Sequence, residues 1–591
     1  MSKKKAGKAF DAKIFMRILG FAKNYKIHFM VATFAVVITA LLGAYRPYLL
    51  KQAVNDFTIQ KNEATLLNYT LLMFAVLIAE VFLQVLFIYF ANWIGQHIIR
   101  DIRSKIFRHI LQFKMSYFDT TSVGKLVTRV VSDIETIASS FSQGLFMIIS
   151  DVLKMLVVTV VMLSINWKLA LIALAVLPIL IYATKLFQIA IKGTFQEVRT
   201  QVANLNGFVQ ERVTGMKIVQ LFSREKIEYE NFMEINEKHK KAHVKAVWYY
   251  SIFFPIAEVL SSIAIGLLVW FGGLQSVNNS DVQPGDIMSF IMMTQMLFRP
   301  LRQIADKFNT LQMGIVSGER VFGVLDTESS INKEGKVIAE KLKGEISFKD
   351  VRFSYIEGEE VVKGISFEVK QGQTVAIVGA TGAGKSTIIN LINRFYEIDA
   401  GQICVDGVAV EAYDLEALRN EIAVVLQDVF LFSDSILNNI TLKNEGITLQ
   451  EVQEAAKQIG IDDFIMSLPN GYDYNVKERG AMLSSGQRQL IAFLRAYVSS
   501  PSILILDEAT SSVDSHAEQM IQYATDTITK GRTSIVIAHR LATIKKADKI
   551  IVMNKGLIVE EGSHKELLQK PQGYYKNLFD KQFSDSETAV F

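Results

Sequence analysis

Long apolar runs fill the first half of the chain and are missing from the second half. Six stretches are long enough to cross the hydrocarbon core of a membrane, which takes about 20 apolar residues per helix. They lie at residues 27–50, 65–92, 141–165, 169–192, 247–272 and 286–309. After about residue 340 the pattern changes to that of a soluble α/β domain. The hydrophobic pattern therefore predicts a helical membrane domain followed by a soluble α/β domain.

The charged segments between these stretches indicate how the chain crosses the membrane. The arm 1–26 carries eight Lys or Arg and one acid, and the loop 100–129 carries seven basic residues and two acids. The hairpin 273–286 has no Lys or Arg. Basic residues collect in cytoplasmic loops, so we expect the arm and the loop in the cytoplasm and the hairpin outside. Six crossings then place both termini in the cytoplasm.

Two of the links between spans are long, charged and helical in pattern. We expect the flanking spans to continue into the cytosol and to turn near Phe118–Gly124 and near Gly215–Phe222. The apolar residues Phe118, Ile218 and Phe222 at these tips favour docking onto another domain. The alternative is a pair of solvated helical hairpins.

Several polar residues lie within the predicted spans. Ionisable groups at membrane depth are costly and usually face a bundle interior or a water-filled cavity. Glu80 and Gln84 share a helix face, because they are four residues apart. Asp151 and Lys154 are three apart, and we expect them to neutralise each other. Glu80 and Glu258 are candidates for lining a cavity, with structural ion pairing as the alternative.

The composition excludes several kinds of protein. The chain has 591 residues, half of them hydrophobic, and a formal net charge of only +4. No overall basic field points to nucleic acid. The single cysteine, Cys404, excludes disulfides within the chain and cysteine-based metal sites. We expect Cys404 to be a small buried apolar residue.

The stretch "VAIVGATGAGKSTIINLI" carries the most specific chemistry. An apolar strand, Val375–Val378, leads into the phosphate-loop pattern G-x-x-x-x-G-K-S from Gly379 to Ser386, and an apolar helix follows. The glycines let backbone N–H groups surround phosphates, and the helix N-terminus adds a positive dipole end. Lys385 is expected to reach the β and γ phosphates, and Ser386 to ligate Mg²⁺.

A second strand with acidic residues complements the loop. In "SILILDEATSSVD" the apolar residues 503–506 end at Asp507 and Glu508. Asp507 suits a position that holds Mg²⁺ through water, and Glu508 is placed to orient or deprotonate the attacking water. Gln427 in "VVLQD" and His539 in "VIAHR" follow other apolar strands and are expected to contribute polar contacts near the γ-phosphate.

The order of these motifs resembles the nucleotide-binding domain of an ATP-binding cassette (ABC) transporter. The stretches "YFDTTSVGKLVTRVVSD", "GMKIVQLFSRE" and "GERVFGVLD" are similar to the membrane domain of an ABC exporter half-transporter with six helices, as in the bacterial multidrug and lipid A flippase group. The resemblance implies ATP and Mg²⁺ as ligands. The residues implied to bind the nucleotide are Tyr355, Gly379, Ala380, Thr381, Gly382, Ala383, Gly384, Lys385, Ser386 and Thr387.

The resemblance also implies a dimer. The signature "LSSGQ" would open a helix that faces the ATP held by the opposing subunit, so that two domains enclose two ATPs head to tail. Tyr355 would stack on adenine, Gln427 would sense both Mg²⁺ and the membrane domain, and Asp514 would cross the dimer interface. The tips at Phe118 and at Gly215, Ile218 and Phe222 would be coupling helices. The signature residues are Leu483, Ser484, Ser485, Gly486 and Gln487.

One departure from the family pattern leaves the partner open. The usual signature is LSGGQ, and Ser485 replaces its first glycine, which adds a Cβ where the backbone approaches a phosphate. Such variants occur in one half of heterodimeric exporters. Glu508 and His539 are present, however, and favour a homodimer with two working sites. The sequence does not decide between a homodimer and a heterodimer.

The expected function is ATP-driven export of an amphipathic molecule such as a drug, a lipid or a lipid-linked glycan. The alternatives are the catalytic half of a heterodimeric multidrug exporter and an ATP-gated channel or membrane regulator. We expect the inner membrane of a bacterial cell, and no nucleic-acid partner. The expected divisions are a basic arm (1–26), a transmembrane domain (27–325), a nucleotide-binding domain (340–580) and a polar tail (581–591).

Overall fold

The chain forms two compact units. The computed structural model describes residues 12–60, 63–277, 282–329, 331, 335–338, 341–507, 515–538 and 541–587. Unit 1 comprises Met1–Leu111 and Ser122–Glu328, and unit 2 comprises Gln112–Thr121 and Ser329–Phe591. The short segment Gln112–Thr121 therefore belongs to unit 2, although unit 1 precedes and follows it in the sequence.

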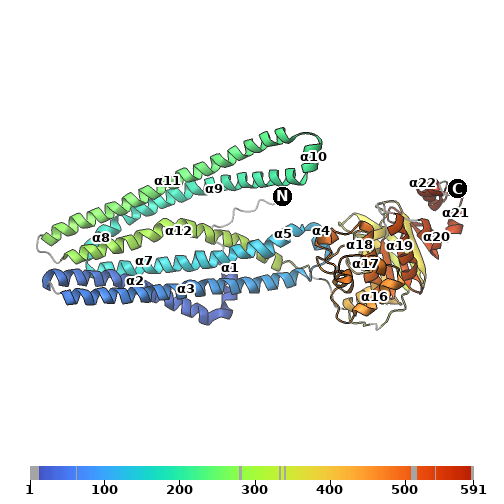
Figure 1. The fold of residues 1–591 in the computed structure, drawn as a ribbon, viewed down its shortest axis with the longest axis horizontal. Coiled ribbons are helices and arrows are strands. Elements are labelled where there is room, and N and C mark those ends of the chain that lie inside the picture. Colours follow the sequence, from blue (N-terminus) through green and yellow to red (C-terminus); the bar gives the residue numbers. More distant parts are fainter. Residues whose placement is uncertain are drawn as a thin grey trace. The chain divides into compact units, whose positions relative to one another are not determined.

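Unit 1 consists, in its described residues, of helices and the short turns between them. Figure 1 shows α2 and α3 running side by side, and α9 and α11 forming a second pair that α10 joins. Two π-helical stretches, Arg129–Asp133 and Ser140–Leu145, interrupt the long helix that ends as α7. The helices are α1 (Ala12–Ala22), α2 (Lys26–Gln60), α3 (Glu63–Ile110), α5 (Val123–Thr128), α6 (Ile134–Ser139), α7 (Phe146–Ile165), α8 (Trp167–Ala175), α9 (Leu177–Thr214), α10 (Met216–Leu221), α11 (Glu225–Val277) and α12 (Pro284–Leu325).

The long helices extend well beyond a membrane span. The helix α3 has 48 residues and α11 has 53, so each is more than about 70 Å long at 1.5 Å per residue, against about 30 Å of hydrocarbon. This confirms the prediction that spans continue as helices past the membrane. The turns also lie where predicted, at α4 (Met115–Thr120) and at α10.

Five helical stretches in the described part of the chain are long and apolar enough to cross a membrane, by length and composition. They are Lys13–Thr58, Glu63–Ile110, Val123–Ile165, Trp167–Thr214 and Glu225–Val277. The sixth predicted span lies in α12, which is not one of the five. Gln295, Arg299 and Gln303 interrupt the apolar sequence of α12, and its role as a span stays a prediction.

Unit 2 is an α/β domain with two sheets. The six-stranded sheet has the order β10 (Leu557–Gly562), β9 (Lys549–Asn554), β3 (Thr374–Gly379), β8 (Thr533–Ile537), β7 (Ile503–Asp507) and β6 (Ile422–Val425). Its strands are parallel except for β10. The antiparallel sheet has the order β2 (Glu360–Val369), β1 (Ile346–Ser354), β4 (Ala400–Val405) and β5 (Val408–Ala409). As predicted, Cys404 is buried, in β4.

The α-helices of unit 2 connect its strands and follow the last of them. They are α13 (Lys385–Ile392), α14 (Leu415–Asn420), α15 (Ile436–Thr441), α16 (Leu449–Gln458), α17 (Asp462–Met466), α18 (Ser485–Val498), α19 (Ser515–Thr529), α20 (Leu541–Lys546), α21 (His564–Gln569) and α22 (Tyr574–Glu587), with α4 from the earlier segment.

Alternate residues of β3 point into two different hydrophobic cores. Val375 and Ile377 pack in the core that contains α13, whereas Ala376 and Val378 pack in the core that contains α18 and α19. Successive side chains of a strand point to opposite faces of its sheet. The helices α13 and α18 therefore lie on opposite faces of the sheet.

Candidate nucleotide-binding site

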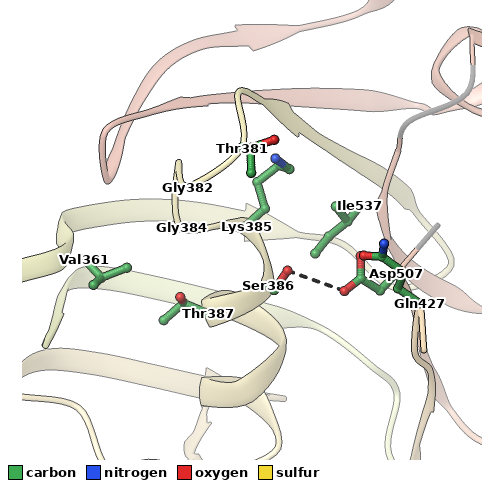
Figure 2. Close-up of a pocket in the computed structure, with 10 residues that line it drawn as sticks. All are labelled: Val361, Thr381, Gly382, Gly384, Lys385, Ser386, Thr387, Gln427, Asp507 and Ile537. Atoms are coloured by element: carbon green, nitrogen blue, oxygen red, sulfur yellow. Dashed lines mark hydrogen bonds between the residues drawn. The ribbon is translucent and has the colours of Figure 1, made fainter. Parts of the chain in front are cut away.

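A cavity of about 340 Å³ opens at the carboxyl ends of the parallel strands. The phosphate-loop segment follows β3, Asp507 ends β7, Ile537 ends β8, and Gln427 comes two residues after β6. Such an edge is the usual ligand site of an open α/β sheet. The lining residues are Val361, Thr381, Gly382, Gly384, Lys385, Ser386, Thr387, Gln427, Asp507 and Ile537 (Figure 2).

The loop folds back on the sheet because two of its glycines allow it. A Cβ on Gly379 would lie 2.2 Å from the carbonyl oxygen of Met553 in β9, so only glycine fits against that strand. Gly384 caps α13 with a φ of 97°, in the left-handed region that glycine adopts without strain. The loop therefore delivers its backbone to the start of α13, as the sequence predicts.

Lys385 is held inside the loop. Its side chain is nearly buried, and Nζ donates hydrogen bonds to the carbonyl oxygens of Gly379 (2.8 Å) and Ala380 (3.0 Å). Burial lowers the pKa of Lys385, and the carboxylate of Asp507 acts in the opposite direction. A phosphate anion in the cavity would favour the charged form of this ammonium group.

Three oxygen-bearing side chains lie beside the lysine. Ser386 Oγ donates a long hydrogen bond of 3.4 Å to Asp507 Oδ2, and Gln427 lines the same cavity (Figure 2). Hydroxyl, carboxylate and amide oxygens are the ligands that Mg²⁺ prefers, usually together with water and substrate phosphates. These three residues fit the predicted magnesium site.

Tyr355 lies beside the loop and is not one of the residues that line the cavity. Its hydroxyl donates to Thr387 Oγ1 (3.3 Å) and accepts from Asn390 Nδ2 (3.1 Å). The ring is partly exposed and meets Tyr396 edge to face, with ring centroids 5.1 Å apart. Tyr355 is thus tied to α13 and keeps part of its ring open to a ligand.

The signature residues lie away from this cavity. Ser484 caps α18, and its hydroxyl and the Gln487 side chain form a capping box at the helix start. This confirms that the signature opens a helix. None of the residues 483–487 lines the cavity, as the position of α18 on the opposite sheet face requires.

The structure brings together Lys385, Ser386, Gln427 and Asp507 among the predicted residues. Glu508, Asp514 and His539 lie outside the described residues. Sequence reasoning missed Val361 and Ile537, whose apolar side chains line the cavity. Ile537 ends the strand that precedes "AHR", so its position at a strand end next to a predicted site residue was a signal in the sequence. Val361 comes from the other sheet and has no such signal.

The first predicted tip, α4, contacts the rest of unit 2 through polar groups. Tyr396 donates a hydrogen bond of 2.6 Å to Asp119, and Lys114 pairs with Glu397 at 3.2 Å. Sequence reasoning had emphasised Phe118 and missed these partners. At the second tip, Gly215 precedes α10, and the side chains of Ile218 and Phe222 are 57% and 66% exposed.

A second cavity, of about 520 Å³, lies between two helices of unit 1. The helix α11 contributes Glu258, whose place on a cavity agrees with the prediction. Polar residues of α12 lie opposite at four-residue intervals, and sequence reasoning did not single them out. The full lining is Phe254, Glu258, Ser261, Ile265, Gln295, Arg299 and Gln303.

The other polar residues of the predicted spans form pairs between helices. Glu80 Oε2 lies 3.5 Å from Arg46 Nη1, which supports the structural alternative for Glu80. Its neighbour Gln84 is exposed. The expected pair of Asp151 with Lys154 is wrong, because Asp151 accepts a hydrogen bond from Lys307 of α12. Packing of α12 against α7 supplies this partner, which spacing along one helix cannot reveal.

Comparisons with known proteins cover nearly the whole chain. Residues 29–301 match the family described as "ABC transporter transmembrane region", and residues 362–511 match the family described as "ABC transporter".

Three relatives illustrate the similarity. The chain is 34% identical to YknV, an ABC transporter ATP-binding protein of Bacillus subtilis (strain 168), over 98% of this chain and 96% of the relative. It is 34% identical to the ATP-dependent lipid A-core flippase of Syntrophus aciditrophicus (strain SB), with the same coverage. It is also 34% identical to YgaD of Bacillus subtilis (strain 168), named as a candidate multidrug export ATP-binding/permease protein, over 96% of this chain and 99% of the relative.

The chain therefore belongs to the ABC transporter family, as a multi-pass membrane protein in which ATP hydrolysis is coupled to transport.

Proposed function

We propose that the chain is one half of an exporter that moves amphipathic molecules, drugs or lipids, across the inner membrane of a bacterial cell by alternating access. The observation that carries this proposal is the cavity in which Lys385, Ser386, Gln427 and Asp507 converge, fused to a helical membrane unit. Both termini lie in the cytoplasm in this proposal, in keeping with the basic arm and with the hairpin 273–286, which has no Lys or Arg.

Phosphoryl transfer needs positioning and charge stabilisation more than covalent chemistry from the protein. Lys385 holds the β and γ phosphates, and the backbone of the loop surrounds them. Ser386, Gln427 and Asp507, the last through water, would hold Mg²⁺, which neutralises charge on the phosphates when bound. Glu508 orients or deprotonates the attacking water, and His539 contacts the γ-phosphate.

The same proposal includes a head-to-tail dimer. The helix α18 lies on the opposite sheet face from α13, and its signature residues do not line the cavity of their own chain. A partner subunit can present that helix N-terminus to the γ-phosphate, as in other anion sites of this kind. We favour a homodimer, because Glu508 and His539 are present. A heterodimer, suggested by Ser485, is the second candidate.

The cavity of unit 1 is the proposed contact for the polar part of the cargo. Glu258 and Arg299 place opposite charges on its two walls, and Gln295 and Gln303 add amide groups. Polar groups within a membrane helix face a cavity or a partner more often than lipid. The names of the relatives, a lipid flippase and a candidate multidrug exporter, support lipids and drugs as the substrate class.

An ATP-gated channel or regulator is the alternative from another class. Gating needs only ATP binding, whereas Glu508 is a residue for hydrolysis. The test is Mg-ATP hydrolysis by the full chain, purified alone in lipid, with Glu508→Gln as the control and chelated Mg²⁺ as a second control.

Turnover that both controls abolish, together with ATP-dependent movement of a fluorescent lipid into the other leaflet, is the expected result. Turnover no greater than that of Glu508→Gln would contradict a self-sufficient homodimer, and a second half-transporter would then be required. ATP-dependent ion current without cargo movement would favour the channel.

A further inference from the structure

The segment that contains α4 is anchored to the rest of unit 2 by residues that follow α13. Tyr396 Oη donates to Asp119 Oδ2 at 2.6 Å, and Lys114 Nζ lies 3.2 Å from Glu397 Oε2. Two backbone hydrogen bonds add to these contacts, from Lys114 N–H to Ser329 O (2.7 Å) and from Ile331 N–H to Gln112 O (3.1 Å). Neighbouring residues 396 and 397 therefore hold the two ends of the same short helix.

Tyr396 also touches the tyrosine proposed to contact adenine. The rings of Tyr396 and Tyr355 meet edge to face, with centroids 5.1 Å apart and planes at 87°. Phe353 packs against both rings, at 4.8 Å from Tyr355 and 5.6 Å from Tyr396. A single aromatic cluster of three rings thus connects the side of the phosphate loop to α4.

The rings of the cluster do not line the phosphate cavity, although the hydroxyl of Tyr355 is bonded to Thr387, which does. Neither Tyr355 nor Tyr396 lines that cavity, whereas Gln427 does. The hydroxyl of Tyr355 is bonded to Thr387 and Asn390 of α13, which fixes one end of the ring while part of its surface stays exposed. A base stacked on that surface would favour one position of the Tyr355 ring, and therefore one arrangement of its edge-to-face contact with Tyr396.

The hydroxyl of Tyr396 is suited to donate its hydrogen bond to Asp119 over a wide pH range. Burial and the hydrogen bond to Asp119 raise the pKa of Tyr396 well above its ordinary value. The phenol therefore keeps its proton in the physiological range, and a phenol-to-carboxylate hydrogen bond is stronger than one between neutral groups.

We propose that Tyr396 is a positioning residue, through which the packing of α4 against the rest of unit 2 depends on the adenine base at Tyr355. This coupling does not pass through the phosphates or through Gln427. The proposal rests on the proposed function, in which Tyr355 contacts adenine. A nucleotide can shift α4 only by binding its two arrangements with different affinity. The aromatic cluster supplies a contact that a base makes and a bare phosphate chain does not.

The test is hydrogen exchange of the full chain in lipid nanodiscs, with and without the non-hydrolysable ATP analogue in which nitrogen bridges the β and γ phosphates. The variants are Tyr396→Phe, which keeps the ring and loses the hydroxyl, and Asp119→Asn, which keeps an acceptor. Lys114→Met is the matched control, because it removes the ion pair with Glu397 and leaves the hydrogen bond between Tyr396 and Asp119 in place.

In the wild type the analogue is expected to slow exchange of residues 113–121 by about fivefold, the lower end of common coupling strengths. Asp119→Asn and Lys114→Met should retain this response, and Tyr396→Phe should lose it. Exchange of the loop 379–387 should slow equally in all of them, and the KM for ATP of Tyr396→Phe should stay within about twofold of the wild type.

A Tyr396→Phe variant that keeps the full response at 113–121, or a wild type without one, would overturn the proposal. Inorganic tripolyphosphate that protects 113–121 as well as the analogue does would also overturn it, because no base is present. A wild type whose loop 379–387 gains no protection from the analogue would instead contradict the proposed nucleotide site itself.

Discussion

At the scale of single residues, the nucleotide cavity depends on glycines of the phosphate loop as much as on its polar side chains. The loop passes so close to β9 that Gly379 has no room for a Cβ. At Gly382, by contrast, a Cβ would meet no atom within 4 Å, although the φ of 80° is strained for other residues. Glycine is therefore required at 379 because a side chain would clash, and at 382 because of the backbone conformation.

Gly379→Ala is expected to destabilise unit 2 by about 1–3 kcal/mol more than Gly382→Ala, because overpacking adds to any backbone strain. Gly382→Ala should cost about 1–2 kcal/mol from backbone strain alone. Thermal unfolding of the purified full-length variants, compared with the wild type, measures both. Equal melting temperatures for the two variants would show that the close approach to Met553 does not matter.

The ion pair of Asp151 gives a second prediction at this scale. Asp151→Asn leaves the partly buried Lys307 without its carboxylate, and breaking such pairs costs up to about 3–5 kcal/mol when they are fully buried. We expect a lower melting temperature in detergent, and recovery of most of the loss when Lys307→Met is added. Asp151→Asn with Lys154→Met is the control and should show no recovery, whereas recovery there would favour the pair within α7.

At the scale of elements, α12 holds unit 1 together. It packs against α2, α7, α11 and the π-helical stretch Ser140–Leu145. One close approach is at Gly314, where a Cβ would lie 2.0 Å from Ser140 Oγ and 2.2 Å from Ser140 Cβ. Ser140 itself donates to the carbonyl oxygen of Thr310. Small residues let two helices approach closely in a membrane protein.

Gly314→Ala is therefore expected to lower the melting temperature, at a cost of about 1–3 kcal/mol from overpacking. Ser140→Gly removes the atoms in the way, so the double variant should be less destabilised than the sum of the two single changes. Gly323→Ala on the same helix, where a Cβ would meet nothing within 4 Å, is the neutral control. Additive losses in the double variant would argue against this contact.

At the scale of the whole molecule, the separation of the loop and the signature on opposite sheet faces favours a composite site. In a head-to-tail homodimer, each site takes the loop of one subunit and the signature of the other. A defect in the loop of one subunit and a defect in the signature of its partner would then fall in the same site. The second site would be intact.

Heterodimers of Lys385→Ala and Gly486→Asp subunits, isolated through two different tags, are thus expected to regain ATP hydrolysis. Each variant alone should be nearly inactive, and the mixed dimer should exceed both by on the order of tenfold, because an intact site keeps its phosphate contacts. A mixed dimer as inactive as its parents would mean that loop and signature act within one chain, and would contradict the proposed dimer.

Local patterns in the sequence determined the elements and the core of the site. The strand before the loop, the loop itself, Asp507 at the end of β7 and the start of α18 all depend on residues close together in the chain, where periodicity and capping act. Apolar runs likewise predicted the long helices, because burial of a helix in lipid needs a continuous stretch. The family resemblance rests on these same motifs.

Only the tertiary structure decided which distant residues meet. It paired Asp151 with Lys307, opposed Glu258 to Arg299 across a cavity, joined Tyr355 through Tyr396 to Asp119, and separated α18 from the loop by the thickness of the sheet. None of these has a sequence signal, because each depends on how helices and sheets pack, and packing is set by shape and burial over the whole unit.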